Sequence, residues 1–350
     1  KFVSKMKKQE MIDIIDKLSK YLNQQNNDNF IVNLNEEQIK VVKSPPDNHI
    51  RIIACAGSGK TTTIVCRIKY LVDNYVVPEK ILLLTFNVES YHNLKKRITE
   101  AFGFEPKIEI RTIDSFSAKI YYNYQFDKVK TKYVGEFAIF AEKIMKEHGK
   151  IICNNYEYVF FDEFQDVSDI QFNILKHFGD NGCYLTVIGD DNQNIYQWRG
   201  TNNMYIINFD NWFKNTNTYT LATNYRSNES IVSLSNNSII LNKNKIEKQM
   251  IAINKNRNIP KLLLHESQDV MFKKVMSLLL EIKRNNNYDL EKFAIVSRTN
   301  TYLKLFEEYL CKRHPEIEFV SFVTDDNNTK IVSEKNKLTL MTIHKSKGLE

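Results

Sequence analysis

The sequence lacks the marks of several structural classes. It has few cysteines, none of them in a C-x-x-C pair, and no His/Cys cluster has the spacing of zinc ligands: Cys55, Cys66, Cys153, Cys183 and Cys311. This pattern excludes a disulfide framework or a structural zinc site and predicts a reducing, intracellular compartment, the cytoplasm or the nucleus. No apolar run approaches the roughly 18–20 residues of a membrane span, so no membrane partner is predicted.

A strong charge of either sign is also missing. The 350 residues carry 49 basic and 42 acidic side chains, a net charge of +7. This mild basic bias permits a nucleic-acid partner without establishing one. The length suffices for two or three domains. Because the first residue is Lys1 rather than Met, the sequence leaves a targeting segment upstream open.

What the sequence does contain is a regular alternation of apolar runs and helical patterns. Residues 1–29 predict an amphipathic helix and an Asn/Gln-rich linker. Strands are then expected at 49–56, 80–86, 108–113, 156–162 and 184–190, and in a second set at 218–225, 261–266, 292–299, 317–322 and 337–343. Helical stretches lie between them, which is typical of parallel α/β sheets. We therefore expect two α/β domains, at residues 30–215 and 216–350.

A glycine-rich stretch, "ACAGSGKTTT", follows the first strand and opens the first helix. Gly57 and Gly59 let backbone N–H groups surround phosphate oxygens, and the start of the helix adds a positive field. Lys60 is expected to reach the β and γ phosphates, and the Thr61 hydroxyl to hold magnesium. The strict pattern has glycine where this chain has Ala54, but strand and helix stand where a P-loop requires them.

A second stretch, "VFFDEFQD" at 159–166, runs an apolar strand into a group of carboxylates. A solvated turn after the strand is the simpler interpretation. A P-loop, however, needs a second strand that ends in an aspartate near the metal, and Asp162 fits this position. Glu163 beside it is the natural base for the attacking water. The pair indicates hydrolysis of a nucleoside triphosphate.

Further motifs accompany these two in a fixed order. They are "LNEEQ" (34–38), "AGSGKT" (56–61), "LLLTF" (82–86), "TIDSF" (112–116), "FFDEFQD" (160–166), "VIGDDNQNIYQWRG" (187–200), "TNYRS" (223–227), "FAIVSRTN" (293–300) and "MTIHKSKGLE" (341–350). Together they resemble the UvrD/Rep/PcrA family of superfamily one DNA helicases, over nearly all of residues 30–350. The resemblance implies two RecA-like P-loop domains with ATP and Mg²⁺ between them.

The resemblance also implies roles in the nucleotide site. Gln38 resembles the residue that reads the adenine edge, Tyr225 the stacking tyrosine, and Glu350 the ribose contact. Lys60, Glu163, Gln193 and Arg226 are the implied catalytic residues, the last two sensing the γ-phosphate; Thr61 and Asp162 are the implied metal ligands. The implied nucleotide-binding set is Gln38, Ala56, Gly57, Ser58, Gly59, Lys60, Thr61, Thr62, Tyr225, Arg226 and Glu350.

On the nucleic-acid side, Phe86 and Trp198 resemble the family's base-stacking residues. Aromatic rings in a basic groove hold a single strand without reading its sequence. Taken alone, Phe86 is better explained as a core residue and His344 as a structural histidine. The other residues implied to touch the strand, or to link the two sites, are Thr112, Ser115, Tyr196, Arg199, Thr342, His344 and Lys347.

Five positions depart from the family pattern. Thr62 stands where an arginine usually flanks the adenine, and Asp114 replaces the histidine of the "T-x-H-S-F" motif. Glu89 follows Val88 where Asn and Lys are common, and it would repel a phosphate. Asn192 replaces a common aspartate.

Two insertions of the family are short here. Only 42 residues separate Phe116 from Val159, and 27 separate Leu310 from Leu338. We therefore expect both accessory helical domains to be reduced or absent, and translocation without their control. The chain stops at Glu350, before the family's last motif and its γ-phosphate arginine. It is thus expected to be a fragment, with weak or no ATP turnover as it stands.

The sequence therefore predicts a monomeric, ATP-dependent helicase or translocase that moves on single-stranded DNA, with 3′-to-5′ polarity implied by the resemblance alone. Three alternatives stay open. They are an RNA-directed helicase, a nucleic-acid-binding scaffold with a decayed ATPase, and the motor subunit of a larger helicase–nuclease. Intact Lys60, Thr61, Asp162, Glu163, Gln193 and Arg226 argue against decay.

Overall fold

The computed structural model describes residues 33–124, 134–323 and 334–348. The chain divides into two compact units, up to Ile259 and from Pro260 onward. The sequence-based boundary at 215/216 differs from this division, because the strand at 216–221 joins the sheet of the first unit. The predicted helix and linker at 1–29 lie outside the described residues.

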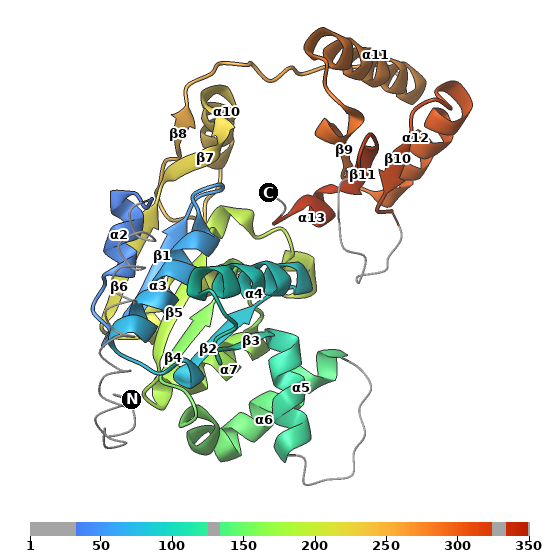
Figure 1. The fold of residues 1–350 in the computed structure, drawn as a ribbon. Helices are drawn as coiled ribbons and strands as arrows, with labels where there is room; N and C mark the ends of the chain where they lie inside the picture. Colours follow the sequence, from blue (N-terminus) through green and yellow to red (C-terminus); the bar gives the residue numbers. More distant parts are fainter. Residues whose placement is uncertain (1–32, 125–133, 324–333, 349–350) are drawn as a thin grey trace, which may run out of the picture. The chain divides into compact units, whose positions relative to one another are not determined.

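The described part of the first unit is built on a sheet of six strands in the order β3-β2-β4-β5-β1-β6, with every pairing parallel. Figure 1 shows these strands with helices packed against them. Their bounds are β1 (His49–Ala54), β2 (Ile81–Thr85), β3 (Glu109–Thr112), β4 (Tyr158–Phe161), β5 (Tyr184–Gly189) and β6 (Thr216–Leu221). The predicted parallel α/β sheet is confirmed, and it has a RecA-like arrangement.

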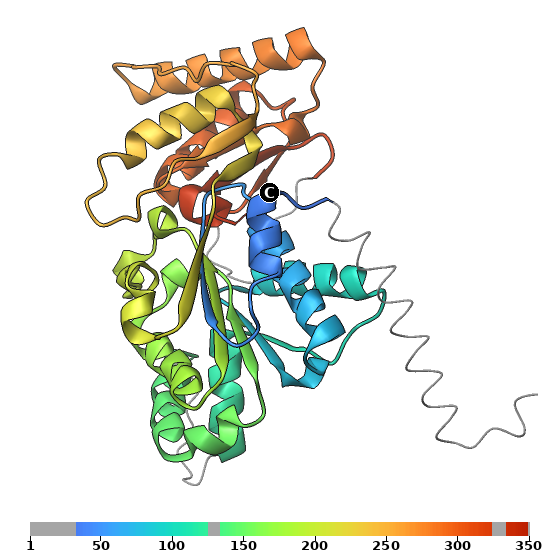
Figure 2. The same ribbon diagram turned by 90° about the vertical axis from the view of Figure 1, so that its left-hand side faces the viewer.

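Strands β2 and β4 of this sheet are nearly continuous apolar runs, and their side chains alternate between two hydrophobic cores, one on each face of the sheet. Leu82 and Leu84 of β2 pack into one core while Ile81 and Leu83 pack into the other. Successive strand side chains point to opposite faces, so a continuous apolar run feeds both. Figure 2 shows helices on the two sides of the sheet.

Different helices cover the two faces. Residues of α2 (Glu36–Val42), α3 (Lys60–Asn74) and α4 (Val88–Phe102) join one core. Residues of five helices join the other: α5 (Ile113–Tyr124), α6 (Val134–Cys153), α7 (Asp169–Asp180), α8 (Met204–Ile207) and α9 (Phe209–Trp212). Side-chain caps fix several starts; Asn35 and Gln38 form a capping box on α2, and Asn87 caps α4.

Only α5 and α6 occupy the place of the first family insertion among the described residues. They pack on each other, and α6 packs on α7. This is the reduced insertion that the short spacing predicts. The second short insertion lies between Leu310 and Leu338, and its described residues include the strand β10 (Phe319–Ser321).

A small α/β extension completes the first unit: β7 (Thr223–Asn228), α10 (Glu229–Ile239) and β8 (Ile251–Asn254), with β7 and β8 parallel. Figure 1 shows α10 beside the two strands. The strand predicted at 218–225 is thus two strands, β6 and β7, interrupted at Ala222. Strand β8 was not predicted: its apolar run, residues 250–253, is only four residues long, and Ile251 and Ile253 are exposed.

The second unit contains a three-stranded parallel sheet in the order β10-β11-β9 within its described part. Its elements are α11 (Gln268–Asn286), β9 (Ala294–Ser297), α12 (Asn300–Arg313), β10, β11 (Leu338–Thr342) and α13 (Ile343–Ser346). Across both units, the described residues also form short 3-10 turns at Pro78–Lys80, Phe164–Asp166, Asp191–Gln193, Gln197–Arg199 and Leu290–Lys292. The strand predicted at 261–266 is wrong: the segment has no regular structure, and Leu262 and Leu264 are exposed. No helix within the described ranges has the length and apolarity to span a bilayer.

Candidate nucleotide and nucleic-acid site

The glycine loop lies at the carboxyl end of β1 and leads into α3. Gly57 and Gly59 have φ of 63° and 77°, in the left-handed region that favours glycine. A Cβ on Gly59 would lie 2.6 Å from Gln38 Nε2, and one on Gly57 would lie 2.9 Å from Arg226 Cβ. Gly59 is the N-cap of α3, so backbone N–H groups at the helix start are available to an anion.

Gln38 supports this loop directly. Its Nε2 donates to the Ser58 carbonyl at 3.2 Å, while its Oε1 accepts from the Asn35 backbone in the capping box. Thus α2 fixes the amide that the family resemblance assigns to adenine recognition. The Ser58 hydroxyl is buried with no hydrogen-bond partner in the structure. Ala56 and Thr61 are half-buried on either side of the loop.

Lys60, Asp162 and Glu163 meet at the carboxyl end of the sheet. Lys60 Nζ lies 3.2 Å from the Glu163 carboxylate, and both side chains are nearly buried. Burial opposes the charge of the ammonium, but Glu163 and then Asp162 outweigh it and raise the pKa of Lys60. Burial, followed by the charge of Glu163, raises the pKa of Asp162 to about 7. Two carboxylates close to one ammonium make a site suited to a further cation.

Glu163 is held in a specific position. Gln165 Nε2 donates to Glu163 Oε2 at 2.7 Å, and Gln165 Oε1 accepts from the Asp190 backbone at 3.0 Å. Gln193 Nε2 in turn donates to Asp190 Oδ2 at 2.9 Å. Gln165 therefore joins the segment after β4 to the segment after β5. Nothing in the sequence indicated that Gln165 positions Glu163, although Gln165 lies inside the quoted "FFDEFQD".

The β7 strand places Tyr225 and Arg226 beside the glycine loop. Asn224 Nδ2 donates to the Ala56 carbonyl at 2.8 Å, and the Tyr225 backbone donates to the Gly57 carbonyl at 2.9 Å. The Tyr225 side chain is 46% exposed and thus accessible to a base. Asn224 is the residue that secures this contact, and sequence reasoning missed it.

An arginine from another helix lies next to Thr62, the position where the family usually has arginine. Arg97 Nη1, from α4, donates to Thr62 Oγ1 at 3.1 Å. The guanidinium thus lies beside residue 62, although residue 62 is not itself arginine. Glu89, the residue expected to repel a phosphate, lies exposed in the first turn of α4, where its charge favours the helix dipole.

An aromatic and cationic row lies on the first unit. The rings of Phe86 and Tyr196 stack with centroids 5.8 Å apart, and the Arg199 guanidinium lies 5.4 Å from the Tyr196 ring. The same guanidinium lies 4.6 Å from the ring of Trp198, which is 67% exposed. Phe86 is half-buried rather than part of the core. The structure thus brings all four residues together.

Thr112 and Ser115 lie where β3 passes into α5. The Ser115 backbone donates to Thr112 Oγ1 at 3.1 Å, and Arg111 Nη1 donates to the Ser115 hydroxyl at 3.2 Å. Asp114, in place of the family's histidine, accepts a 3.4 Å hydrogen bond from Gln171. This edge therefore presents hydroxyls and a guanidinium.

The remaining predicted residues belong to the second unit. Thr342 is the N-cap of α13 and accepts from the Lys345 backbone at 3.3 Å. His344 and Lys347 are half-buried in and just after this helix. Glu350, the predicted ribose contact, lies outside the described residues.

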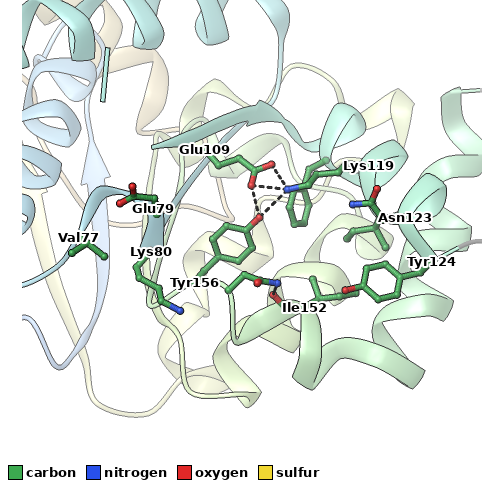
Figure 3. Close-up of a pocket in the computed structure, with 12 residues that line it drawn as sticks. Val77, Glu79, Lys80, Glu109, Lys119, Asn123, Tyr124, Ile152 and Tyr156 are labelled. Atoms are coloured by element: carbon green, nitrogen blue, oxygen red, sulfur yellow. Dashed lines mark hydrogen bonds and ion pairs between the residues drawn. The ribbon is translucent and has the colours of Figure 1, made fainter. Parts of the chain in front are cut away.

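A separate pocket of about 550 Å³ lies at the opposite edge of the sheet, near the amino ends of β2 and β4. Figure 3 shows Glu109, Lys119 and Tyr156 meeting in it. Lys119 Nζ lies 2.6 Å from Glu109 Oε1 and 3.3 Å from the Tyr156 hydroxyl. The charges satisfy one another, so we assign this cluster a structural role.

Two protein-family models match this chain. Residues 38–199 match the family model described as an AAA domain, and residues 219–325 match that of the UvrD-like helicase C-terminal domain.

Curated relatives cover most of the chain. A protein of Acanthamoeba polyphaga mimivirus named as an ATP-dependent DNA helicase is 28% identical over 92% of this chain and 47% of its own length. A DNA helicase II homolog of Mycoplasma capricolum is 26% identical over 82% and 52%. The ATP-dependent DNA helicase PcrA of Bacillus subtilis is 22% identical over 80% and 49%.

The chain thus spans about half the length of the curated relatives it matches. A solved structure of Pif1 helicase from Candida albicans is 17% identical, with a TM-score of 0.32, and the match covers 53% of this chain and 39% of that one. The two matched family models, the relatives and the glycine-loop site agree, and the chain belongs to the family of UvrD/PcrA-like helicases.

Proposed function

We propose that this chain is the motor part of an ATP-dependent DNA helicase that moves along single-stranded DNA, in the 3′-to-5′ direction. The observation that supports this most is a pair of neighbouring features on one unit. The Lys60–Glu163 pair lies beside the glycine loop, and the row of Phe86, Tyr196, Arg199 and Trp198 follows the same carboxyl edge of the sheet. One feature suits phosphates and the other suits bases.

In the proposed mechanism the glycine loop and Lys60 bind the β and γ phosphates of ATP. Tyr225 stacks on the adenine, and Gln38 reads its edge. Glu163, held by Gln165, orients the attacking water and accepts its proton. Gln193 and Arg226 sense whether the γ-phosphate is present.

The donor set also fits Mg²⁺. Thr61 offers a hydroxyl and Asp162 a carboxylate that is 3% exposed, and magnesium binds through a few hard oxygens together with substrate phosphates and water. The described residues hold no group of three His, Cys, Asp or Glu side chains placed to bind a metal ion. When bound, the ion would neutralise charge on the β and γ phosphates.

DNA contacts follow from the exposed row. Bases stack on Trp198 and Phe86, while Arg199 supplies positive charge and a cation–π contact. In the first unit, the hydroxyls of Thr112 and Ser115 contact the DNA backbone or link it to the nucleotide site. In the second unit, the same role falls to the side chains of Thr342, His344 and Lys347. Movement then arises as ATP binding and hydrolysis change the hold on successive bases.

The test is ATP hydrolysis by the full natural protein with no nucleic acid, with single-stranded DNA, or with RNA of the same length. We expect stimulation by DNA, its loss in Lys60→Ala, and unchanged turnover in Lys40→Ala, which removes an exposed lysine of α2. Glu163→Gln should bind ATP but hydrolyse it about 10²–10⁴-fold more slowly. Stimulation by RNA alone would favour the RNA-directed alternative, and stimulation by neither would favour a binding scaffold.

A further inference from the structure

The loop that carries Gln193 begins with two buried carboxylates. Asp190 and Asp191 directly follow β5, and their side chains are 5% and 0% exposed. Adjacent buried carboxylates repel each other and lose their hydration, so they persist only with a cationic partner and hydrogen bonds.

Lys248 is that partner, and it comes from a distant part of the sequence. It lies between α10 and β8, its side chain is 4% exposed, and its Nζ is 3.0 Å from Asp190 Oδ1. The same ammonium also contacts Asp191 Oδ1. Burial opposes the charge of Lys248, but the two aspartates outweigh this and raise its pKa, so the ammonium remains charged.

Asp190 in turn fixes the γ-phosphate sensor. Its Oδ2 accepts from Gln193 Nε2 at 2.9 Å, and its carbonyl accepts from the Gln193 backbone at 2.9 Å. Its own backbone donates to Gln165, which holds Glu163. A displacement of Asp190 would therefore shift the side chains of both Gln193 and Glu163.

Two further contacts attach the same segment to this loop. The Ile246 backbone donates to Asp191 Oδ2 at 2.9 Å, and Asn242 Nδ2 donates to Asn192 Oδ1 at 2.9 Å. The extension formed by β7, α10 and β8 touches the glycine loop at its other end, through Asn224 and Tyr225. This extension thus contacts both the glycine loop and the loop that leads to Trp198.

We propose that Lys248 is a positioning residue for ATP hydrolysis: by holding Asp190 and Asp191 it keeps Gln193 aimed at the γ-phosphate and transmits nucleotide binding to the loop of Trp198. This inference rests on the proposed function of the site. A purely structural ion pair would stabilise the fold without affecting the sensor.

The test uses the full natural protein with Trp212→Phe, so that Trp198 is the only tryptophan left in residues 1–350; any tryptophan outside them is replaced as well. Lys248→Met should lower the DNA-stimulated kcat about a hundredfold, since small misplacements cost that much, with little change in the KM for ATP. The change in Trp198 fluorescence on ATP binding should disappear. Lys248→Arg should restore part of both. Lys245→Met removes a nearby lysine that contacts Ile239, Ile240 and Glu247, and this variant should behave as the parent.

If Lys248→Met fails to fold, the pair Lys248→Gln with Asp191→Asn keeps the net charge of the cluster and should show the same loss. A folded variant that is less stable but keeps its kcat and its Trp198 response would overturn the proposal. Absence of DNA-stimulated hydrolysis in the parent would instead contradict the proposed function, and the Trp198 response to ATP would still decide the role of Lys248.

Discussion

Glu163 has a left-handed backbone, with φ of 56°. The other non-glycine residues of this kind in the described ranges are asparagines, which tolerate that conformation. A glutamate is held there only if its surroundings fix it, and Lys60 and Gln165 both contact its carboxylate. The strain is in keeping with a residue whose position matters for chemistry.

The Glu109 cluster gives a pH prediction at the same scale. Burial raises the pKa of the Glu109 carboxyl, but hydrogen bonds from Lys119, Tyr156 and Arg111 outweigh it and lower the pKa below its ordinary value. Because the folded form binds the proton less tightly, this stabilisation is present above the unfolded pKa of about 4.5. It is lost as the pH falls through the folded value.

Glu109→Gln should therefore reduce the free energy of unfolding by about 1–3 kcal/mol at pH 7, since it weakens charged hydrogen bonds. The difference from the parent should shrink below pH 4.5. Urea unfolding between pH 3.5 and 7 measures this, with Glu79→Gln, on the same pocket, as control. A difference independent of pH would contradict the assignment.

At the scale of elements, the strands of the main sheet could be predicted because each is an apolar run bounded by polar turns. "KILLLTF" and "YEYVFFD" contain β2 and β4, and the carboxyl ends of these strands carry Phe86 and Asp162. The same rule failed at 261–266, where three leucines lie in a segment without strand structure. Apolar content alone does not supply a pairing partner.

The α10–β8 extension marks a second limit of sequence reasoning. Lys248 lies in "KIEKQM", which carries no motif, and its importance arises only from packing against Asp190 and Asp191. Likewise Asn224 and Gln165 lie inside recognised motifs, but their hydrogen bonds depend on how distant strands align. Tertiary contacts of this kind leave no local signal in one sequence.

The aromatic row predicts a specific loss of single-strand binding. Trp198→Ala should weaken binding of an unstructured DNA oligonucleotide by about 1–3 kcal/mol, because one stacked base is released. The salt dependence should stay the same, since no charge is removed. Fluorescence anisotropy at two salt concentrations measures both. Trp212→Phe is the control, because Trp212 packs against Phe172; an equal loss in both variants would contradict the stacking role.

At the scale of the molecule, the chain consists of a first unit with a complete six-strand sheet in its described residues and a second unit with a smaller parallel sheet. The glycine loop, Glu163, Gln193, Tyr225 and the aromatic row all lie on the first unit. Thr342, His344 and Lys347 lie on the second. The proposed motor needs both units, because hydrolysis must change the hold of one unit on the strand relative to the other.

The most direct measurement of that coupling is strand separation by the full natural protein on a duplex with either a 3′ or a 5′ single-stranded overhang. We expect ATP-dependent separation from the 3′ overhang, and none in Lys60→Ala or Glu163→Gln. Normal DNA-stimulated hydrolysis without separation from either overhang, in a protein that binds both, would contradict the claim that this site drives movement along DNA.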